Sequence, residues 1–324
     1  MPLYPGIPYG PAPSWAFPFF DCCIVFLFVL CLLDAWRRGR GAISYLLGGM
    51  CFGLVLEYLE VASHSYTYGH FLLMLGHAPM DIPVSIGLAW GIILYTSRLF
   101  SDGLRLPWVA AAALDTVLAL NLDLTMDVIA YRMHMWHWDW TGTGLDPLKA
   151  EWFGIPYGNF VGWISVVFFY SFFSRLYERT IFKRTGLKQT GMWRFPAIAV
   201  LALISAQVEL LVTEYFLFHW LNAVHIGSGR RLAIEVVVLL GLVCWGSLRR
   251  RGGPRRRVPG VAVWVPAWFH VYFAIALVAL GFFRENGWMT LVAGVNVGIG
   301  LVIHLWPVVG KKAEPGSLVW AETV

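Results

Sequence analysis

Two acidic pairs in the sequence lie at helical spacing inside apolar stretches. Asp123 and Asp127 are four residues apart in "NLDLTMDVIAY", and Glu57 and Glu60 are three apart in "LVLEYLEVA". Residues at these spacings share one face of a helix. Where water is scarce, one carboxyl group of such a pair can keep its proton near neutral pH and act as a general acid. The spacing therefore indicates proton-transfer chemistry.

The stretches that carry these acids are typical of a membrane protein. The chain of 324 residues is 58% hydrophobic and 13% charged, and its mean hydropathy is +0.65. A soluble domain is roughly a quarter charged, and a membrane-spanning helix needs about 20 apolar residues. We therefore predict an all-α transmembrane bundle with nine spans, at 14–33, 42–62, 81–99, 107–131, 160–176, 195–220, 232–248, 260–281 and 288–307.

Basic residues predict the orientation of these spans. Most of the 24 Lys and Arg residues fall in short loops on one side, and the exceptions are Arg132, Lys149, Arg230, Arg231 and Arg284. Because cytoplasmic loops carry the excess of Lys and Arg, we predict that the N-terminus lies outside and the C-terminus inside. We expect an integral protein of a bacterial plasma membrane. We expect no nucleic-acid partner, since the net charge of +5 comes from these loops.

The Arg-rich segment "RRRGGPRRR" at 249–257 divides the chain. Seven spans with many acids precede it, and two spans with almost none follow it. We predict a seven-helix membrane domain at 1–248, two additional transmembrane helices at 258–312 and a polar C-terminal tail at 313–324. The five cysteines all lie inside apolar spans, so no disulfide framework and no CxxC metal motif is expected.

With this topology, acids from five spans fall in the outer half of the membrane. Ionisable residues inside a membrane are costly and mark function by default. We infer a polar pocket that opens outward, formed by the spans that carry Glu57, Glu60, Asp81, Asp123, Asp127, Glu209, Glu214 and Glu235. Asp115 is expected to lie deeper. The alternative is a structural role, in which the acids bind Arg132, backbone groups or one another and hold helices together.

Two long segments predicted outside the membrane mix aromatic residues with His and Gly. The segment "SHSYTYGHFLLMLGHAPMD" joins the second and third spans, and "RMHMWHWDWTGTGLDPLKAEWFGIPYGNF" joins the fourth and fifth. Segments so rich in Trp are expected to lie on the membrane or to re-enter it. An aromatic belt at the interface explains Trp136, Trp138 and Trp140 about as well as contact with a substrate does.

Together these motifs resemble the DUF422 carotenoid biosynthesis family, whose best-known members are CruF-type carotenoid hydratases. The resemblance rests on an acid followed by "SYTYG" and "DIPVSIGLAW", and on "TMDVIAYRMHMWHWDW" followed by "WFGIPYGNFVGW". The family pattern corresponds here to Glu57, Tyr66, Tyr68, Asp81, Pro83, Trp90, Asp127, Trp136, Trp138, Gly154, Pro156, Asn159, Phe160 and Trp163.

The resemblance implies hydration of the terminal 1,2 double bond of an acyclic carotenoid end, without a cofactor or a metal. Asp127 or Glu57 would protonate the double bond, and Asp123 and Glu60 would be their paired acids. Asp81 and Asn159 would orient the water that captures the tertiary cation. The expected substrate-binding residues are Tyr66, Tyr68, Trp90, Trp136, Trp138, Phe160, Trp163 and Glu214. A carotenoid and membrane lipid are the expected partners, and other carotenoid-pathway enzymes are candidate partners.

Three other functions fit parts of the pattern. The segment "DLTMD" has a DxxxD spacing that can hold Mg2+ and a diphosphate in prenyl transfer, but no good second Asp-rich motif occurs. His64, His70, His77, His134 and His137 suggest a metal-dependent desaturase or hydroxylase, although no HxxHH box is present. A transporter or a carotenoid-binding scaffold could also use the pocket. Transporters often contain repeats, and no convincing repeat occurs here.

Overall fold

A computed structural model describes residues 8–185, 193–224, 226–249 and 258–309. Nine helices in these ranges are long and apolar enough to cross a membrane. This confirms the predicted all-α bundle of nine spans. The predicted polar tail at 313–324 lies outside the described residues, as does most of the Arg-rich segment at 249–257.

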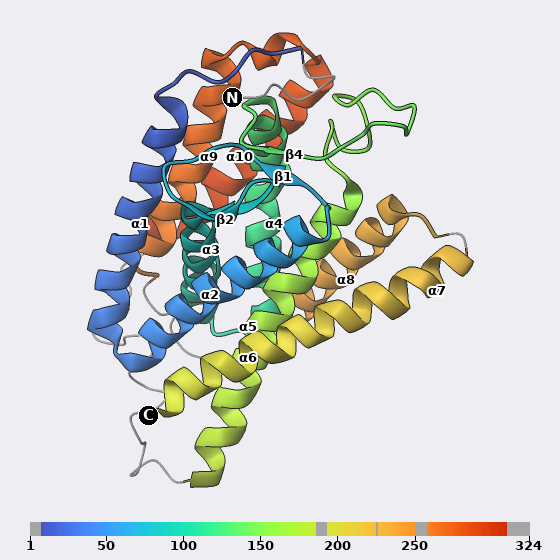
Figure 1. Ribbon diagram of the computed structural model, residues 1–324. Coiled ribbons are helices and arrows are strands. Elements are labelled where there is room, and N and C mark those ends of the chain that lie inside the picture. Colours follow the sequence, from blue (N-terminus) through green and yellow to red (C-terminus); the bar gives the residue numbers. More distant parts are fainter. Residues whose placement is uncertain (1–7, 186–192, 225, 250–257, 310–324) are drawn as a thin grey trace.

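Figure 1 shows the elements in chain order. The first five long helices are α1 (Ala16–Arg38), α2 (Arg40–Ala62), α3 (Val84–Gly103), α4 (Trp108–Arg132) and α5 (Tyr157–Thr185). The sixth span combines α6 (Arg194–Val212), the π-helix η1 (Thr213–Leu217) and α7 (Phe218–Ala223). The last elements are α8 (Ser228–Leu248), α9 (Val261–Ala279), the 3-10 helix η2 (Phe282–Arg284) and α10 (Gly287–Val309).

Glycine and proline set the ends of the helices that lead to the acidic residues. Gly39 separates α1 from α2 with a φ of 100°, a region that glycine adopts readily. Its N–H donates to the carbonyl of Ala35 at 3.0 Å and so completes α1. The helices α3 and α4 begin directly after Pro83 and Pro107, because proline lacks the N–H that a first helical turn leaves unpaired.

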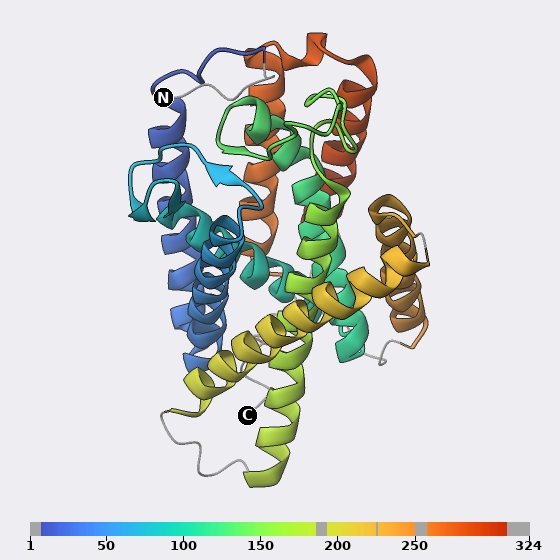
Figure 2. The ribbon, with the colours of Figure 1, turned by 45° about the vertical axis from the view of Figure 1, so that its right-hand side comes forward.

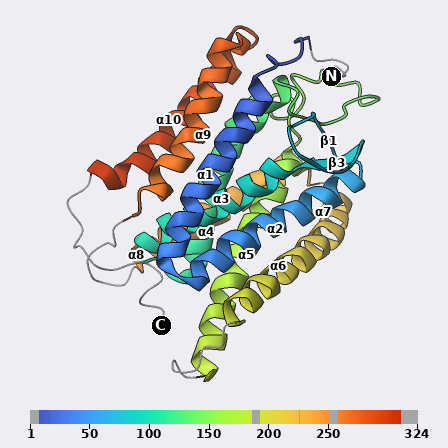
Figure 3. The ribbon, with the colours of Figure 1, turned by 60° about the vertical axis from the view of Figure 1, so that its left-hand side comes forward.

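The helices α3 and α4 form the centre of the bundle. In their most apolar stretches, 83% and 78% of the residues are buried, against 17% for α8. The C-terminal pair α9 and α10 packs on this centre, since α9 contacts both α3 and α4, and α10 contacts α4. In Figure 3 the pair lies beside α1, away from α6 and α7.

Four short strands gather at the end of the bundle where α2 ends and α5 begins. Figure 2 shows the loops that carry them at this end of the bundle. β2 (Met74–His77) and β3 (Met80–Pro83) form an antiparallel pair. β1 (Thr67–Tyr68) pairs antiparallel with β4 (Trp136–His137), with Thr67 opposite His137 and Tyr68 opposite Trp136. The β1–β4 pairing therefore joins the two aromatic segments that the sequence places between different spans.

Candidate active site

A cavity of about 50 Å³ lies where β1 and β4 meet α2, α3, α4 and α5. A buried water molecule needs about 10–15 Å³, so the space suits a few waters or the end of one apolar chain. Many of the residues singled out from the sequence line this cavity: Glu57, Tyr66, Tyr68, Trp90, Asp127, Trp136, Trp138, Asn159 and Trp163.

Glu57, on α2, accepts three side-chain hydrogen bonds in this cavity. Trp90 donates from Nε1 to Glu57 Oε1 at 2.7 Å, and the hydroxyls of Tyr66 and Tyr68 both donate to Oε2. Three donors suit a carboxylate, which accepts hydrogen bonds and donates none. Gly53 permits this arrangement, because a Cβ on it would lie only 2.4 Å from the Cβ of Trp90.

The two tyrosines are fixed as donors by their surroundings. Burial, followed by the negative charge of Glu57, raises the pKa of Tyr66 and of Tyr68 well above the ordinary value. Both phenols therefore keep their protons at physiological pH. The β1–β4 pairing holds the two rings against the Trp-rich segment, with 5.7 Å between the ring centroids of Tyr66 and Trp138.

Asp123 and Asp127, on α4, share one donor from α5. The amide nitrogen Nδ2 of Asn159 donates to Asp127 Oδ2 at 2.6 Å and to Asp123 Oδ2 at 3.1 Å. Both carboxyl groups are buried, with exposed fractions of 0% for Asp123 and 3% for Asp127. No ion pair joins either acid to a basic side chain among the described residues. Two buried acids thus share one neutral amide donor.

Aromatic rings form much of the remaining wall. Trp90 on α3 and Trp163 on α5 lie 4.2 Å apart between ring centroids, and Tyr68 lies 6.2 Å from Trp136. Trp136 and Trp138 are 6% and 7% exposed, so these rings are buried in the site and do not form an outer belt. Aromatic faces attract a positive charge within about 6 Å of the ring centroid.

The other residues predicted for the site lie near the cavity or away from it. Glu60 lies one turn after Glu57 and is partly buried, and Asp81 lies in β3 opposite Gly76. Phe160 is fully buried, packs against Trp152 at 6.2 Å between ring centroids and does not line the cavity. Glu214 lies in η1, and its side chain falls outside the described part of the structure.

The spans that form the cavity differ from those expected. Glu209 on α6 accepts a hydrogen bond from Thr213, and Glu235 on α8 pairs with Arg231 at 2.8 Å. Each of these acids has a polar partner one turn away on the same span, and neither lines the cavity. Instead α1 contributes Phe20 and α9 contributes Phe269. Both are apolar residues in apolar helices, so the sequence carried no signal that could single them out.

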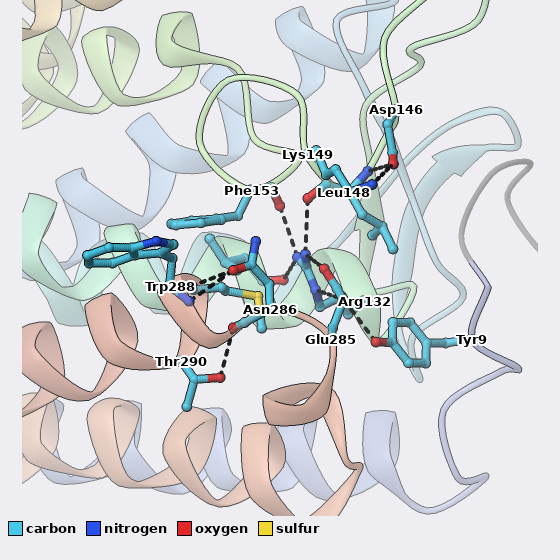
Figure 4. Close-up of polar contacts among 12 residues, drawn as sticks. Tyr9, Arg132, Asp146, Leu148, Lys149, Phe153, Glu285, Asn286, Trp288 and Thr290 are labelled. Atoms are coloured by element: carbon cyan, nitrogen blue, oxygen red, sulfur yellow. Dashed lines mark hydrogen bonds and ion pairs between the residues drawn. The ribbon is translucent and has the colours of Figure 1, made fainter.

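Arg132, considered from the sequence as a partner for the acids, binds elsewhere. Its guanidinium forms two hydrogen bonds with Glu285, at 2.6 and 2.7 Å, as Figure 4 shows. It also donates to the backbone carbonyls of Val128 and Phe153. Arg132 therefore leaves Asp123 and Asp127 without the cation nearest to them along α4.

Asp115 has a structural role, which was the alternative that the sequence offered for all the acids inside the spans. It is 1% exposed and pairs with Arg175 at 2.6 Å, and Ser171 donates to it at 2.5 Å. Arg175 in turn binds Asp102 at 2.9 Å, which ties α4, α5 and the end of α3 together. Because Asp115 lies two turns before Asp123 and pairs with Arg175, it belongs to a separate ion-pair cluster.

A family profile described as "Carotenoid biosynthesis protein" matches residues 18–227. The chain belongs to this family. Membership supports a role in carotenoid biosynthesis and an enzymatic activity, in a membrane protein. No curated protein and no solved structure matches the chain. The profile covers every residue that lines the cavity except Phe269, which lies on α9 beyond residue 227.

Proposed function

We propose that the protein adds water across the terminal 1,2 double bond of an acyclic carotenoid end. The observation that carries this proposal is that one aromatic cavity holds buried carboxyl groups in two different environments. Asp127 shares a neutral amide with Asp123, whereas Glu57 receives three donors. Two titratable groups in such different surroundings are suited to different steps of acid catalysis.

Asp127 is the proton donor in this proposal. Two buried carboxylates without a cation repel one another, so the Asp123–Asp127 pair holds one proton. Asp127 lines the cavity and Asp123 lies one turn behind it, so only Asp127 reaches an alkene in the cavity. Transfer of this proton to C2 breaks the π bond, leaves Asp127 ionised and forms a tertiary cation at C1.

Glu57 and the rings stabilise that cation. The negative charge of Glu57 lies in the same cavity, and the rings of Trp90, Trp136 and Tyr68 line it. A water molecule then attacks C1 and forms the C–O bond. It releases one proton to the carboxylate of Asp127, which restores the starting state. The sum of the steps is alkene plus water giving a tertiary alcohol.

Expression in cells that accumulate lycopene tests the proposal. We expect a product heavier by one water, with the hydroxyl at C1, and no such product when Asp127 is replaced by Asn. Incubation in H₂¹⁸O should place the label in that hydroxyl. An unchanged pigment that co-purifies with the protein would instead support a carotenoid-binding scaffold, and a prenylated pigment would support a transferase.

A further inference from the structure

The helix α9 closes one side of the cavity with the ring of Phe269. Phe269 is 1% exposed and lines the cavity together with Ile93 on α3 and Met126 on α4. The helix α9 packs against both α3 and α4. Other lining residues, such as Tyr66 and Trp163, are partly exposed. Phe269 therefore belongs to the closed part of the cavity wall.

Phe269 lies deeper in the bundle than the carboxyl group that faces the cavity. It lies ten residues before the end of α9, and Ile93 lies nine residues after the start of α3, whereas Asp127 lies only five residues before the end of α4. These helix ends all lie at the end of the bundle that carries the strands, since α3 follows β3 and Glu285, just after α9, binds Arg132 in the last turn of α4. With a rise of 1.5 Å per residue, the three depths are about 15, 14 and 8 Å. Ile93 and Phe269 thus form a cavity floor beyond Asp127.

The last helix, α10, fixes the direction in which Phe269 points. The next residue, His270, is buried and faces α10, where a Cβ on Gly300 would lie only 2.1 Å from His270 Nε2. Successive residues of a helix are about 100° apart, so Phe269 is turned from α10 toward the cavity. Asn296, also on α10, donates from Nδ2 to the backbone carbonyl of Asn121 on α4 at 2.6 Å. This hydrogen bond holds α10, and with it α9, against the helix that carries the acids.

We infer that Phe269 selects the acyclic end of a carotenoid over a ring end. The inference rests on the proposed function. A ring end is wider than an acyclic end, and its double bond lies within a six-membered ring. To bring that double bond to Asp127, the ring would have to occupy the space that Phe269 fills. The family profile ends at residue 227, so this selectivity comes from a helix that the profile does not cover.

Two substitutions in α9 test the role of the cavity floor. With purified protein in detergent, visible absorption and circular dichroism report carotenoid binding. We expect the wild type to bind lycopene about tenfold or more tightly than β-carotene, whose two ends are rings, because a pocket of fixed size rejects a larger group. Phe269→Ala removes the ring from the floor and should bring the two affinities within about threefold. Phe273→Ala is the matched control, because Phe273 lies one turn later on α9 and is also 1% exposed but does not line the cavity. It should keep the wild-type preference.

A second variant keeps the inference falsifiable if Phe269→Ala does not fold. Phe269→Leu keeps an apolar side chain but removes the flat ring, so it should relax the preference in the same direction by a smaller factor. A wild-type preference for lycopene in both Phe269 variants would overturn the inference. So would an equal loss of preference in Phe273→Ala, or a wild type that binds both carotenoids equally.

The proposed reaction and the role of Phe269 can fail separately. If the wild type prefers lycopene without hydrating it and Phe269→Ala loses that preference, the reaction is wrong and the role of Phe269 stands. If the wild type hydrates lycopene and the Phe269 variants keep its preference, the reaction stands and the role of Phe269 is wrong.

Discussion

Arg132, in the last turn of α4, pairs with Glu285, between η2 and the final helix α10, with 2.6 Å between Arg132 Nη2 and Glu285 Oε1 (Figure 4). The arginine side chain is fully buried, and the hydroxyl of Tyr9 also donates to Glu285, at 2.9 Å. The family profile ends at residue 227. The pair therefore ties the C-terminal helices, which the profile does not cover, to the helix that carries Asp127.

Replacing Arg132 with Met should destabilise the protein strongly. Loss of one partner from a buried ion pair leaves the other uncompensated and costs about 3–5 kcal/mol. Thermal unfolding in detergent measures the change. Lys149→Met is the control, because Lys149 is 76% exposed and its pair with Asp146 lies at the surface. Equal unfolding temperatures for the two variants would show that the Arg132–Glu285 pair adds nothing.

Asp127→Asn should abolish hydration while the protein still folds. The amide keeps the size of the side chain but cannot transfer an acidic proton, and general acid catalysis contributes about 10²–10⁴ to a rate. Product formation from lycopene, at matched protein levels, measures the loss. Asp139→Asn is the control, since Asp139 is exposed and accepts a hydrogen bond from the nearby Thr141 at 2.8 Å. Full activity of Asp127→Asn would exclude Asp127 as the donor.

Removing one donor to Glu57 should slow the reaction at least about tenfold. A hydrogen bond to a charged group contributes about 1.5–3 kcal/mol, and Tyr66→Phe or Tyr68→Phe deletes one such bond without changing the ring. The double variant should lose more than either single one. Tyr58→Phe, on the exposed side of α2 at 51% exposure, should leave the rate unchanged. Rates for the single variants that match Tyr58→Phe would contradict this role for Glu57.

Stability should fall as the pH drops from about 6.5 to about 4, and His137 should account for part of the fall. Burial lowers the pKa of His137 to about 4, below the ordinary 6.5, and its ring stacks on Tyr131 at 5.4 Å. The unfolded state then binds the proton more tightly, so His137 favours the folded state above pH 6.5 and loses this contribution below it. This shift in pKa corresponds to about 3 kcal/mol of unfolding free energy.

His137→Gln isolates this contribution, since glutamine does not titrate. Unfolding temperatures measured from pH 7 to pH 4 should fall less steeply for the variant than for the wild type. Parallel curves for the two proteins would mean that His137 does not titrate with a lowered pKa.

The sequence by itself determined the nine spans and the residue types that meet in the cavity. Long apolar stretches predict membrane helices whatever their neighbours, because every backbone polar group must be satisfied within the helix. Acids inside such stretches are rare enough to be noticed one by one. Asp123 and Asp127 share a helix face through their spacing alone, and the aromatic motif around Trp136 and Asn159 indicated the family.

Only the tertiary structure decided which of these residues meet. A helix that is apolar all round has no polar face to show which side touches its neighbours. The sequence therefore could not separate Glu57, which faces the cavity, from Glu235, which pairs with Arg231. Nor could it join Arg132 to Glu285, or place Phe269 at the site, because these contacts depend on how α9 and α10 pack against α4.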